Sequence, residues 1–253
     1  MWVKPRATSS QLQKNRSDIF RGWDSLNNGY TTLVGVAYLT GYDLRGQGYD
    51  ALRERFSKYD IEVCSGFSTL FNYLSHLNNR HYQLVDQYFD GEVIVDSASL
   101  NAQMDVLMRQ LEHYASYRSL FTFDGFANAL TFGAHKSNAI EKAIDVLRNK
   151  LMKLCQYASA TNSYYAKARE MTACLKRGIR LAGNLTYVEG RFVGNSRGYE
   201  RWLSELHDIM AEIDKKIEDL KKHEKKYKGI VYTDMPGRYG GAQAGPLEIF
   251  NSK

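Results

Sequence analysis

The sequence predicts an all-α protein: an elongated bundle of long antiparallel helices, with a helical hairpin at its N-terminus and one or two short β-hairpins. No proline occurs between Pro5 and Pro236, and proline is the residue that most strongly interrupts a helix. Apolar residues recur at alternating steps of three and four through most of this stretch, as they do on one face of a helix. Hydrophobic residues make up 43% of the chain, which is enough to form a core.

The first predicted helix covers residues 8–40, with Ser9 or Ser10 as its cap and Gly41 at its C-terminal end. Its apolar seam consists of Leu12, Ile19, Trp23, Leu26, Tyr30, Leu33 and Ala37. Three glycines fall within it: Gly22, Gly29 and Gly35. Each glycine costs a helix about 1 kcal/mol relative to alanine. We therefore expect this helix to depend on packing against another element.

The second predicted helix covers residues 48–89 and ends at Asp90-Gly91. Its seam consists of Leu52, Phe56, Tyr59, Val63, Leu70, Leu74, Leu77, Leu84 and Tyr88. A third helix begins near Ser97, with Asp96 or Ser97 as its cap. Its apolar positions are Leu100, Met104, Leu107, Leu111, Tyr114 and Phe121.

The fourth predicted helix has the most regular pattern, a heptad seam sustained over residues 137–180. The seam consists of Ile140, Ile144, Leu147, Leu151, Leu154, Ala158, Thr161, Tyr165 and Ala168. As one continuous helix it would be roughly 65 Å long. A fifth helix repeats the pattern with Leu203, Leu206, Met210, Ile213, Ile217 and Leu220.

Two apolar interruptions, at residues 120–126 and 185–193, separate these helices. The first contains Asp124-Gly125 and the second contains Glu189-Gly190, each between alternating apolar residues. Such a pattern favours a tight β-hairpin turn. Short irregular helices are the alternative interpretation of both segments.

The residues that carry chemistry form no recognisable catalytic or metal-binding pattern. The six histidines include no His-Glu-x-x-His or Glu-x-x-His arrangement. No phosphate-binding glycine loop precedes a Lys-Ser or Lys-Thr pair. Cys64, Cys155 and Cys174 are widely spaced, and their helical contexts predict buried free thiols. We therefore expect no enzymatic activity, no metal and no cofactor in this chain.

The formal net charge of +6 allows nucleic acid, acidic lipid or an acidic protein as a partner. No recognition-helix motif supports nucleic acid. The longest uncharged run, residues 25–42, is too polar to span a membrane, and no signal peptide is evident. The eighteen tyrosines fit either core packing or a surface that binds a protein partner.

The C-terminal segment has the composition of a linker. Residues 239–246 contain three glycines and a proline. The sequence thus predicts a helical domain over residues 1–229 and a flexible linker over residues 230–253, leading toward a further C-terminal domain that this chain does not contain.

The most informative motif is the glycine-rich break between the first two predicted helices, whose residues are Leu44-Arg45-Gly46-Gln47-Gly48-Tyr49-Asp50-Ala51. It resembles the Leu-x-Gly break of the LXG domain, the N-terminal domain of polymorphic toxins that Gram-positive bacteria export by type VII secretion. Leu44, Gly46 and Gly48 carry this likeness. The break is also similar to the turn of small WXG-type helical-hairpin proteins, with Leu44 in place of tryptophan.

The resemblance implies a delivery module, not a catalytic one. It implies binding to two small WXG-like helical-hairpin proteins, transfer to the membrane ATPase of the secretion system, and export from the cytoplasm of a C-terminal toxin used in competition between bacteria. It implies neither nucleic-acid binding nor stable membrane insertion. The family's export signal, an aromatic residue followed by an acid, is expected mainly in the partner; by letters it is also matched here by Phe56 with Asp60 and by Tyr82 with Asp86.

The apolar seams of the first two helices are the predicted partner-binding face. Its residues are Leu12, Ile19, Trp23, Leu26, Tyr30, Leu33, Leu52, Phe56, Val63 and Leu70. The alternative functions are a self-assembling helical scaffold, which would cover these seams with copies of itself, and a basic helical protein that binds nucleic acid.

Overall fold

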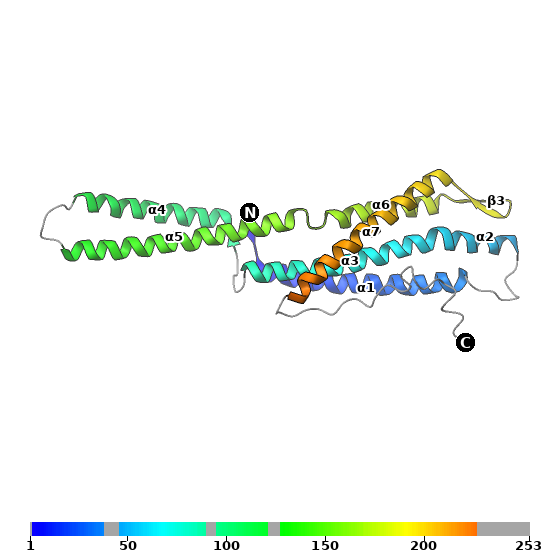
Figure 1. The fold of residues 1–253 in the computed structure, drawn as a ribbon, viewed down its shortest axis with the longest axis horizontal. Coiled ribbons are helices and arrows are strands. Elements are labelled where there is room, and N and C mark those ends of the chain that lie inside the picture. The colour runs from blue at the N-terminus through cyan, green and yellow to red at the C-terminus, as the bar shows by residue number, and fades with distance from the viewer. Residues whose placement is uncertain (1, 38–45, 90–94, 121–126, 227–253) are drawn as a thin grey trace. The chain divides into compact units, whose positions relative to one another are not determined.

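The computed structural model describes residues 2–37, 46–89, 95–120 and 127–226, and confirms the predicted all-α class. The helices are α1 (Pro5–Ala37), α2 (Gln47–Arg55), α3 (Ile61–Phe89), α4 (Ser97–Leu120), α5 (Ala127–Asn162), α6 (Ala166–Gly183) and α7 (Ser196–Lys226). A short π-helix, Phe56–Asp60, joins α2 to α3. The strands are β1 (Trp2–Val3), β2 (Val95–Asp96), β3 (Thr186–Val188) and β4 (Arg191–Val193) (Figure 1).

The chain divides into two compact units. The first contains residues up to Gln11 together with Leu84–Ser163, and the second contains Leu12–Gln83 and the chain from Tyr164 onward. The sequence pattern gave no sign of this division. The boundary expected near residue 229 lies outside the described residues, as does the expected linker.

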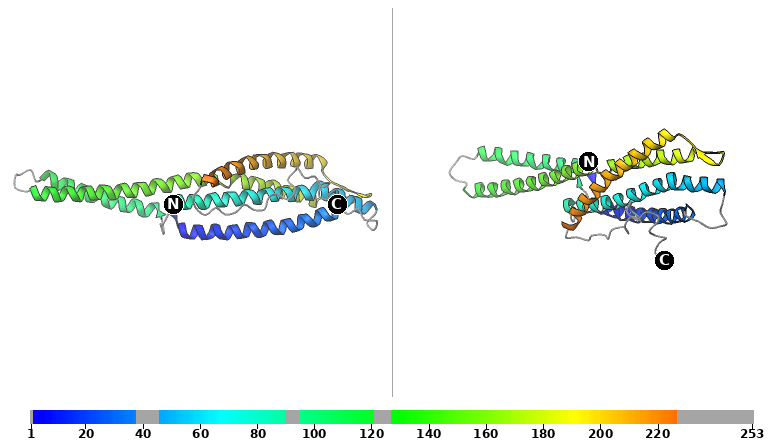
Figure 2. Two further views of the ribbon diagram at one scale, coloured as in Figure 1. Left: turned by 60° about the horizontal axis from the view of Figure 1, so that its bottom comes forward. Right: turned by 45° about the vertical axis from the view of Figure 1, so that its right-hand side comes forward.

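In the first unit, α4 and α5 form an antiparallel helical pair. The two helices lie side by side in both views of Figure 2. The carboxylate of Asp96 caps α4, since it accepts hydrogen bonds from the amides of Ala98 (3.3 Å) and Ser99 (3.2 Å). Leu154 of α5 is buried, and Phe89 meets Tyr157 edge to face with ring centroids 5.0 Å apart. Strand β1 pairs with β2, a sheet of two residues per strand that is too short to show a periodic pattern.

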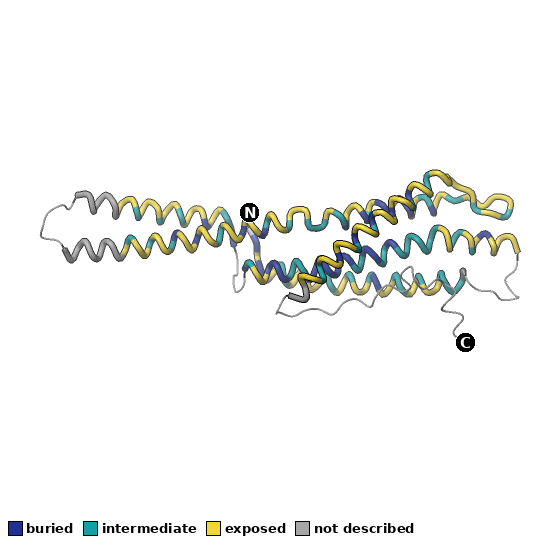
Figure 3. The backbone as a smooth tube through the Cα atoms, viewed as in Figure 1, coloured by how far each residue is buried: buried dark blue, intermediate teal, exposed yellow. Residues whose placement is uncertain are grey.

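In the second unit, α3, α6 and α7 enclose the main core. Its fully or nearly fully buried members are Leu70, Tyr73, Leu77, Ala168, Met171, Cys174, Leu175, Trp202, Leu206, Ile209, Ile213 and Ile217. Helix α1 packs on α3: a Cβ at Gly22 would lie 2.9 Å from the ring of Phe71, and the Asn78 amide donates to the carbonyl of Leu12 (2.9 Å). In Figure 3 the buried residues of α3 and α7 appear dark blue.

The predicted fourth helix is not continuous, and that prediction was wrong. Helix α5 ends at Asn162 and α6 starts at Ala166, with a turn over residues 163–165. Residues 161–164 read Thr-Asn-Ser-Tyr, a run of residues with modest helix propensity. Tyr165 is held instead by His81, whose Nδ1 lies 3.0 Å from the Tyr165 hydroxyl. The helix before the turn also starts ten residues earlier than predicted, at Ala127.

The contact between His81 and Tyr165 predicts a pH-dependent stability. Burial lowers the pKa of His81 below its ordinary value of 6.5, so unfolding takes up a proton when the pH lies between the two pKa values. The contribution of neutral His81 to the free energy of unfolding is complete above pH 6.5, and it is lost as the pH falls toward and through the folded-state pKa. We expect the free energy of unfolding of a His81→Gln variant to change less between pH 7.5 and pH 5 than that of the parent chain, as measured by urea denaturation. Equal changes in both chains would contradict this prediction.

The hairpin predicted over residues 185–193 is confirmed. Strands β3 and β4 pair antiparallel, with Tyr187 opposite Phe192. The two turn residues, Glu189 (φ 47°) and Gly190 (φ 85°), both have positive φ, which matches the twist of a tight hairpin. The hairpin predicted over residues 120–126 lies outside the described residues, except that Leu120 is the last residue of α4.

Candidate interaction surface

The junction between α1 and α2 requires the glycine of the Leu-x-Gly motif. Gly46 caps α2 with φ 134° and ψ 159°, a conformation that is open essentially to glycine alone. Its carbonyl accepts the first two hydrogen bonds of the helix, from the amides of Tyr49 (3.0 Å) and Asp50 (3.1 Å). Leu44 and Arg45 lie outside the described residues.

Tyr49, which follows the glycines, ties the two helices of the N-terminal hairpin together. Its hydroxyl donates to the carbonyl of Val36 (2.8 Å). Val36 belongs to the last turn of α1, where carbonyls have no partner within the helix. Two residues after Tyr49, Ala51 is buried. The motif thus starts α2 and also attaches it to the end of α1.

The β-hairpin packs against Gln47 and Gly48 at the start of α2. A Cβ at Gly48 would lie 3.6 Å from the Tyr187 hydroxyl, and a Cβ at Gly190 would lie 3.0 Å from the side-chain oxygen of Gln47. Residues opposite each other in an antiparallel pair point to the same face, so Phe192 lies on the same face of the hairpin as Tyr187. The guanidinium of Arg55 stands 5.2 Å from the Phe192 ring.

The π-helix Phe56–Asp60 lies directly after α2. Its Lys58 carbonyl accepts a hydrogen bond from the hydroxyl of Tyr199 in α7, whose pKa burial raises to about 12, so the hydroxyl stays protonated as a donor. Burial also raises the pKa of Asp60, opposed by Arg55, whose Nε lies 3.5 Å from its carboxylate. This segment matches the letters of the export signal, and its acid is paired within the chain.

The requirement for Gly46 can be tested against a second glycine. Gly46→Ala is expected to lower the free energy of unfolding by about 1–3 kcal/mol, because alanine is strained at φ 134°. Gly29→Ala is the matched control. A Cβ at Gly29, inside α1, would meet nothing within 4 Å, so alanine should raise stability by up to about 1 kcal/mol. Urea denaturation measures both, and changes of the same sign would contradict the assignment.

The structure divides the predicted partner-binding face into buried and accessible parts. Leu12, Trp23 and Leu70 are buried within the chain, so a partner cannot reach them in this conformation. The half-buried members are Ile19, Leu26, Tyr30, Leu33, Phe56 and Val63. Leu52 is exposed, and Gly46 and Gly48 are exposed as well. Ala37, the last seam residue of α1, has no described side chain.

Burial changes along a single face of α1. At 100° per residue, Leu12, Trp23, Leu26 and Leu33 lie within about 80° of one another around the helix. The first two are 3% and 6% exposed, yet no described residue from 24 to 36 is buried. A Cβ at Gly29 or at Gly35 would also find open space. The seam is therefore covered by the chain in its first half and open in its second, near the motif.

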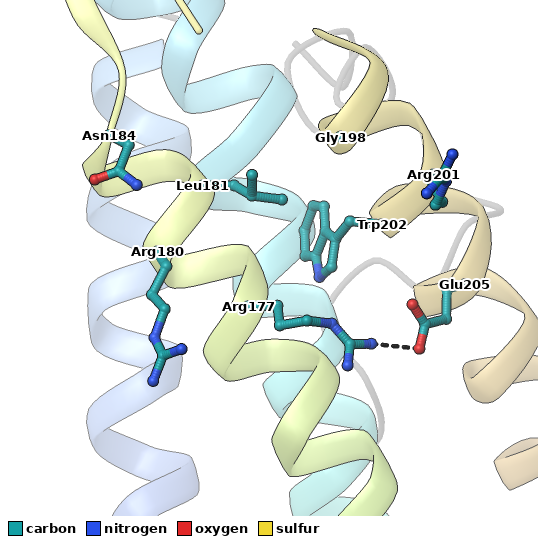
Figure 4. Close-up of a pocket in the computed structure, with 8 residues that line it drawn as sticks. All are labelled: Arg177, Arg180, Leu181, Asn184, Gly198, Arg201, Trp202 and Glu205. Carbon is teal, nitrogen blue, oxygen red and sulfur yellow. Dashed lines mark hydrogen bonds and ion pairs between the residues drawn. The ribbon is translucent and has the colours of Figure 1, made fainter. Parts of the chain in front are cut away.

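Sequence reasoning missed a pocket between α6 and α7 (Figure 4). Its volume is about 320 Å³, and its lining includes Arg177, Arg180, Arg201, Leu181, Trp202 and Glu205. Trp202 lies one helical turn before the predicted seam residue Leu206, and the basic run around Arg177 lies beyond the predicted seam of the fourth helix. Trp202 and this basic run were the two sequence features that could have indicated the pocket.

The cysteines differ from one another in burial. Cys174 is buried and Cys64 half-buried, whereas Cys155 is exposed on α5, contrary to the expectation of three buried thiols. Burial raises the pKa of Cys64 to about 11, which keeps it a thiol at neutral pH. Among the described residues, no three His, Cys, Asp or Glu side chains stand together as metal ligands would. No described helix is long and apolar enough to cross a bilayer.

No protein-family model matches this chain, and no curated protein is significantly similar to it. The geometry of the junction and of the open seam is therefore the basis on which a function can be proposed.

Proposed function

We propose that this chain is the delivery module of an antibacterial toxin. It binds two small helical-hairpin proteins and directs a C-terminal toxin domain to export by type VII secretion. The N-terminal helical hairpin and the glycine-dependent start of α2 support this proposal, because they are the features on which the resemblance to LXG domains depends.

The observation that carries the proposal is the open second half of the α1 seam. Leu26, Tyr30 and Leu33 continue the face that is buried at Leu12 and Trp23, but they are only half-buried. A partner helix laid along this face would bury apolar area by the ridges-into-grooves packing of helical bundles. The open glycine at 29 lets its backbone approach closely.

The proposal predicts that two small helical-hairpin proteins are encoded beside this chain, and it is tested by expressing the chain together with them. We expect one complex containing all three proteins in size-exclusion chromatography with light scattering, and poor solubility or oligomerisation of the chain alone. A stable monomer that leaves both neighbours unbound would refute the proposal. A homo-oligomer that leaves both neighbours unbound would favour the self-assembling scaffold.

A pair of variants on α1 locates the interface. Leu33→Asp is expected to weaken the complex at least tenfold, because it places a charge in the open seam, where loss of a central apolar contact costs more than about 1 kcal/mol. Thr31→Asp adds the same charge on an exposed position facing away from the seam and should leave affinity unchanged. Isothermal titration calorimetry measures both, and equal effects would place the interface elsewhere.

A further inference from the structure

The pocket between the end of α6 and the start of α7 combines a fixed apolar floor with a cationic rim. Trp202 is 3% exposed, and its Nε1–H donates to the carbonyl of Cys174 (2.9 Å). Its ring lies so close to Gly178 that a Cβ there would come within 2.2 Å of it. The floor is therefore held in one position before any ligand arrives, which lowers the entropy lost on binding.

The rim carries more positive than negative charge. Arg177 on α6 pairs with Glu205 on α7 across the gap between the helices (Figure 4). Arg180 and Arg201 also line the pocket, and neither has an ion pair or hydrogen bond to another described side chain. These two guanidinium groups stand at opposite outer edges of the pocket, Arg180 on the side of α6 away from α7 and Arg201 on α7 (Figure 4). A guanidinium matches a carboxylate with two parallel hydrogen bonds.

The size and surroundings of the pocket decide among anionic ligands. A volume of about 320 Å³ is at the lower end for ligand sites and accommodates one or two side chains. A nucleic-acid groove would require a longer basic stripe. On α7, exposed Glu200 lies beside Arg201 and interrupts such a stripe. The polar amide of Asn184 also lines the pocket and can bind a peptide backbone.

We propose that this pocket binds an acidic peptide segment of a partner protein, with a carboxylate held by Arg180 or Arg201 and an apolar side chain resting on the half-buried Leu181, next to Trp202. The start of the long helix α7 adds to the attraction, because the N-terminal end of a helix favours negative charge. The pocket lies on α6 and α7, not on the seam of α1. The inference therefore stands independently of the proposed delivery function.

The test uses the full chain labelled with ¹⁵N and a blocked synthetic peptide, acetyl-Glu-Leu-Glu-Glu-Leu-Glu-amide. The chain has three tryptophans, and the indole N–H signal of Trp202 is identified by its loss in Trp202→Phe. We expect a saturable shift of this signal and none of the Trp23 signal, with an affinity that falls as sodium chloride is raised. Absence of saturation would overturn the proposal.

Charge-reversal variants and control ligands complete the test. The double variant Arg180→Glu with Arg201→Glu should weaken binding at least tenfold, whereas Arg169→Glu, an exposed change on α6 outside the pocket, should not. Circular dichroism verifies that each variant is folded. The proposal is overturned if the peptide with glutamine in place of glutamate binds equally well. It is also overturned if Arg169→Glu weakens binding as much as the double variant, or if inorganic phosphate reproduces the shift at equal concentration.

Discussion

Replacing Leu206 with alanine is expected to lower the free energy of unfolding by about 2–5 kcal/mol, the range for removing a fully buried leucine. Leu206 is 0% exposed and belongs to the core shared by α3, α6 and α7. A Cβ at Gly66 of α3 would lie only 3.1 Å from it, so α3 packs closely against this side chain. Such close packing limits how far the neighbours can collapse into the cavity.

The control for this prediction is Leu203→Ala in the same helix. Leu203 is only half-buried at the edge of the core. The Leu203→Ala substitution therefore removes the same atoms as Leu206→Ala but loses fewer packing contacts. Urea denaturation compares the two variants. If Leu203→Ala costs as much as Leu206→Ala, the core does not have its centre where the structure places it.

Replacing Gly178 with alanine is the second change with a large expected effect. The new methyl would meet the Trp202 ring at 2.2 Å, and a buried indole cannot bend away as a flexible side chain can. Overpacking of this kind costs about 1–3 kcal/mol. If the indole moves off the Cys174 carbonyl, the unmade buried hydrogen bond adds about 1–3 kcal/mol.

Gly183→Ala is the matched control for this change. Gly183 ends the same helix, and a Cβ there would meet nothing within 4 Å, so we expect little change in stability. Urea denaturation gives the stability, and the Trp202 indole signal in the NMR spectrum gives the local effect. If the Gly178→Ala chain has normal stability and an unmoved indole signal, then the Trp202 ring does not pack against Gly178 of α6.

The helices were predictable because their apolar periods are long and no proline interrupts them. The seam of α7 is the clearest case: Leu206, Ile213 and Ile217 were predicted on one face and are buried together. The interruption at residues 163–165 was not predictable from the period, because Tyr165 and Ala168 keep the heptad spacing across it. The last residue of the turn, Tyr165, contacts His81, which lies 84 positions away in sequence.

The candidate site could be predicted only in part. Gly46 was identifiable, since a glycine between two helical patterns indicates a special backbone conformation, although the value of φ was not. The separation of Leu12 and Trp23 from Leu26 and Leu33 could not be read from the sequence, because all four share one face and only tertiary packing decides which are covered. The pocket between α6 and α7 is formed by two helices that the fold brings together, so no local sequence pattern predicts it.

The π-helix has a consequence for any rod-shaped molecule that lies along the N-terminal hairpin. A π turn holds one residue more than an α turn, and one residue corresponds to about 100° of rotation around the axis. The positions of α2 are therefore out of phase with those of α3, although the helical backbone runs on without a gap. A straight helical partner that follows the half-buried Val63 on α3 would lose Leu52, which stands 39% exposed on α2. The π-helix Phe56–Asp60 thus sets a limit to the length of a continuous interface along this side of the hairpin.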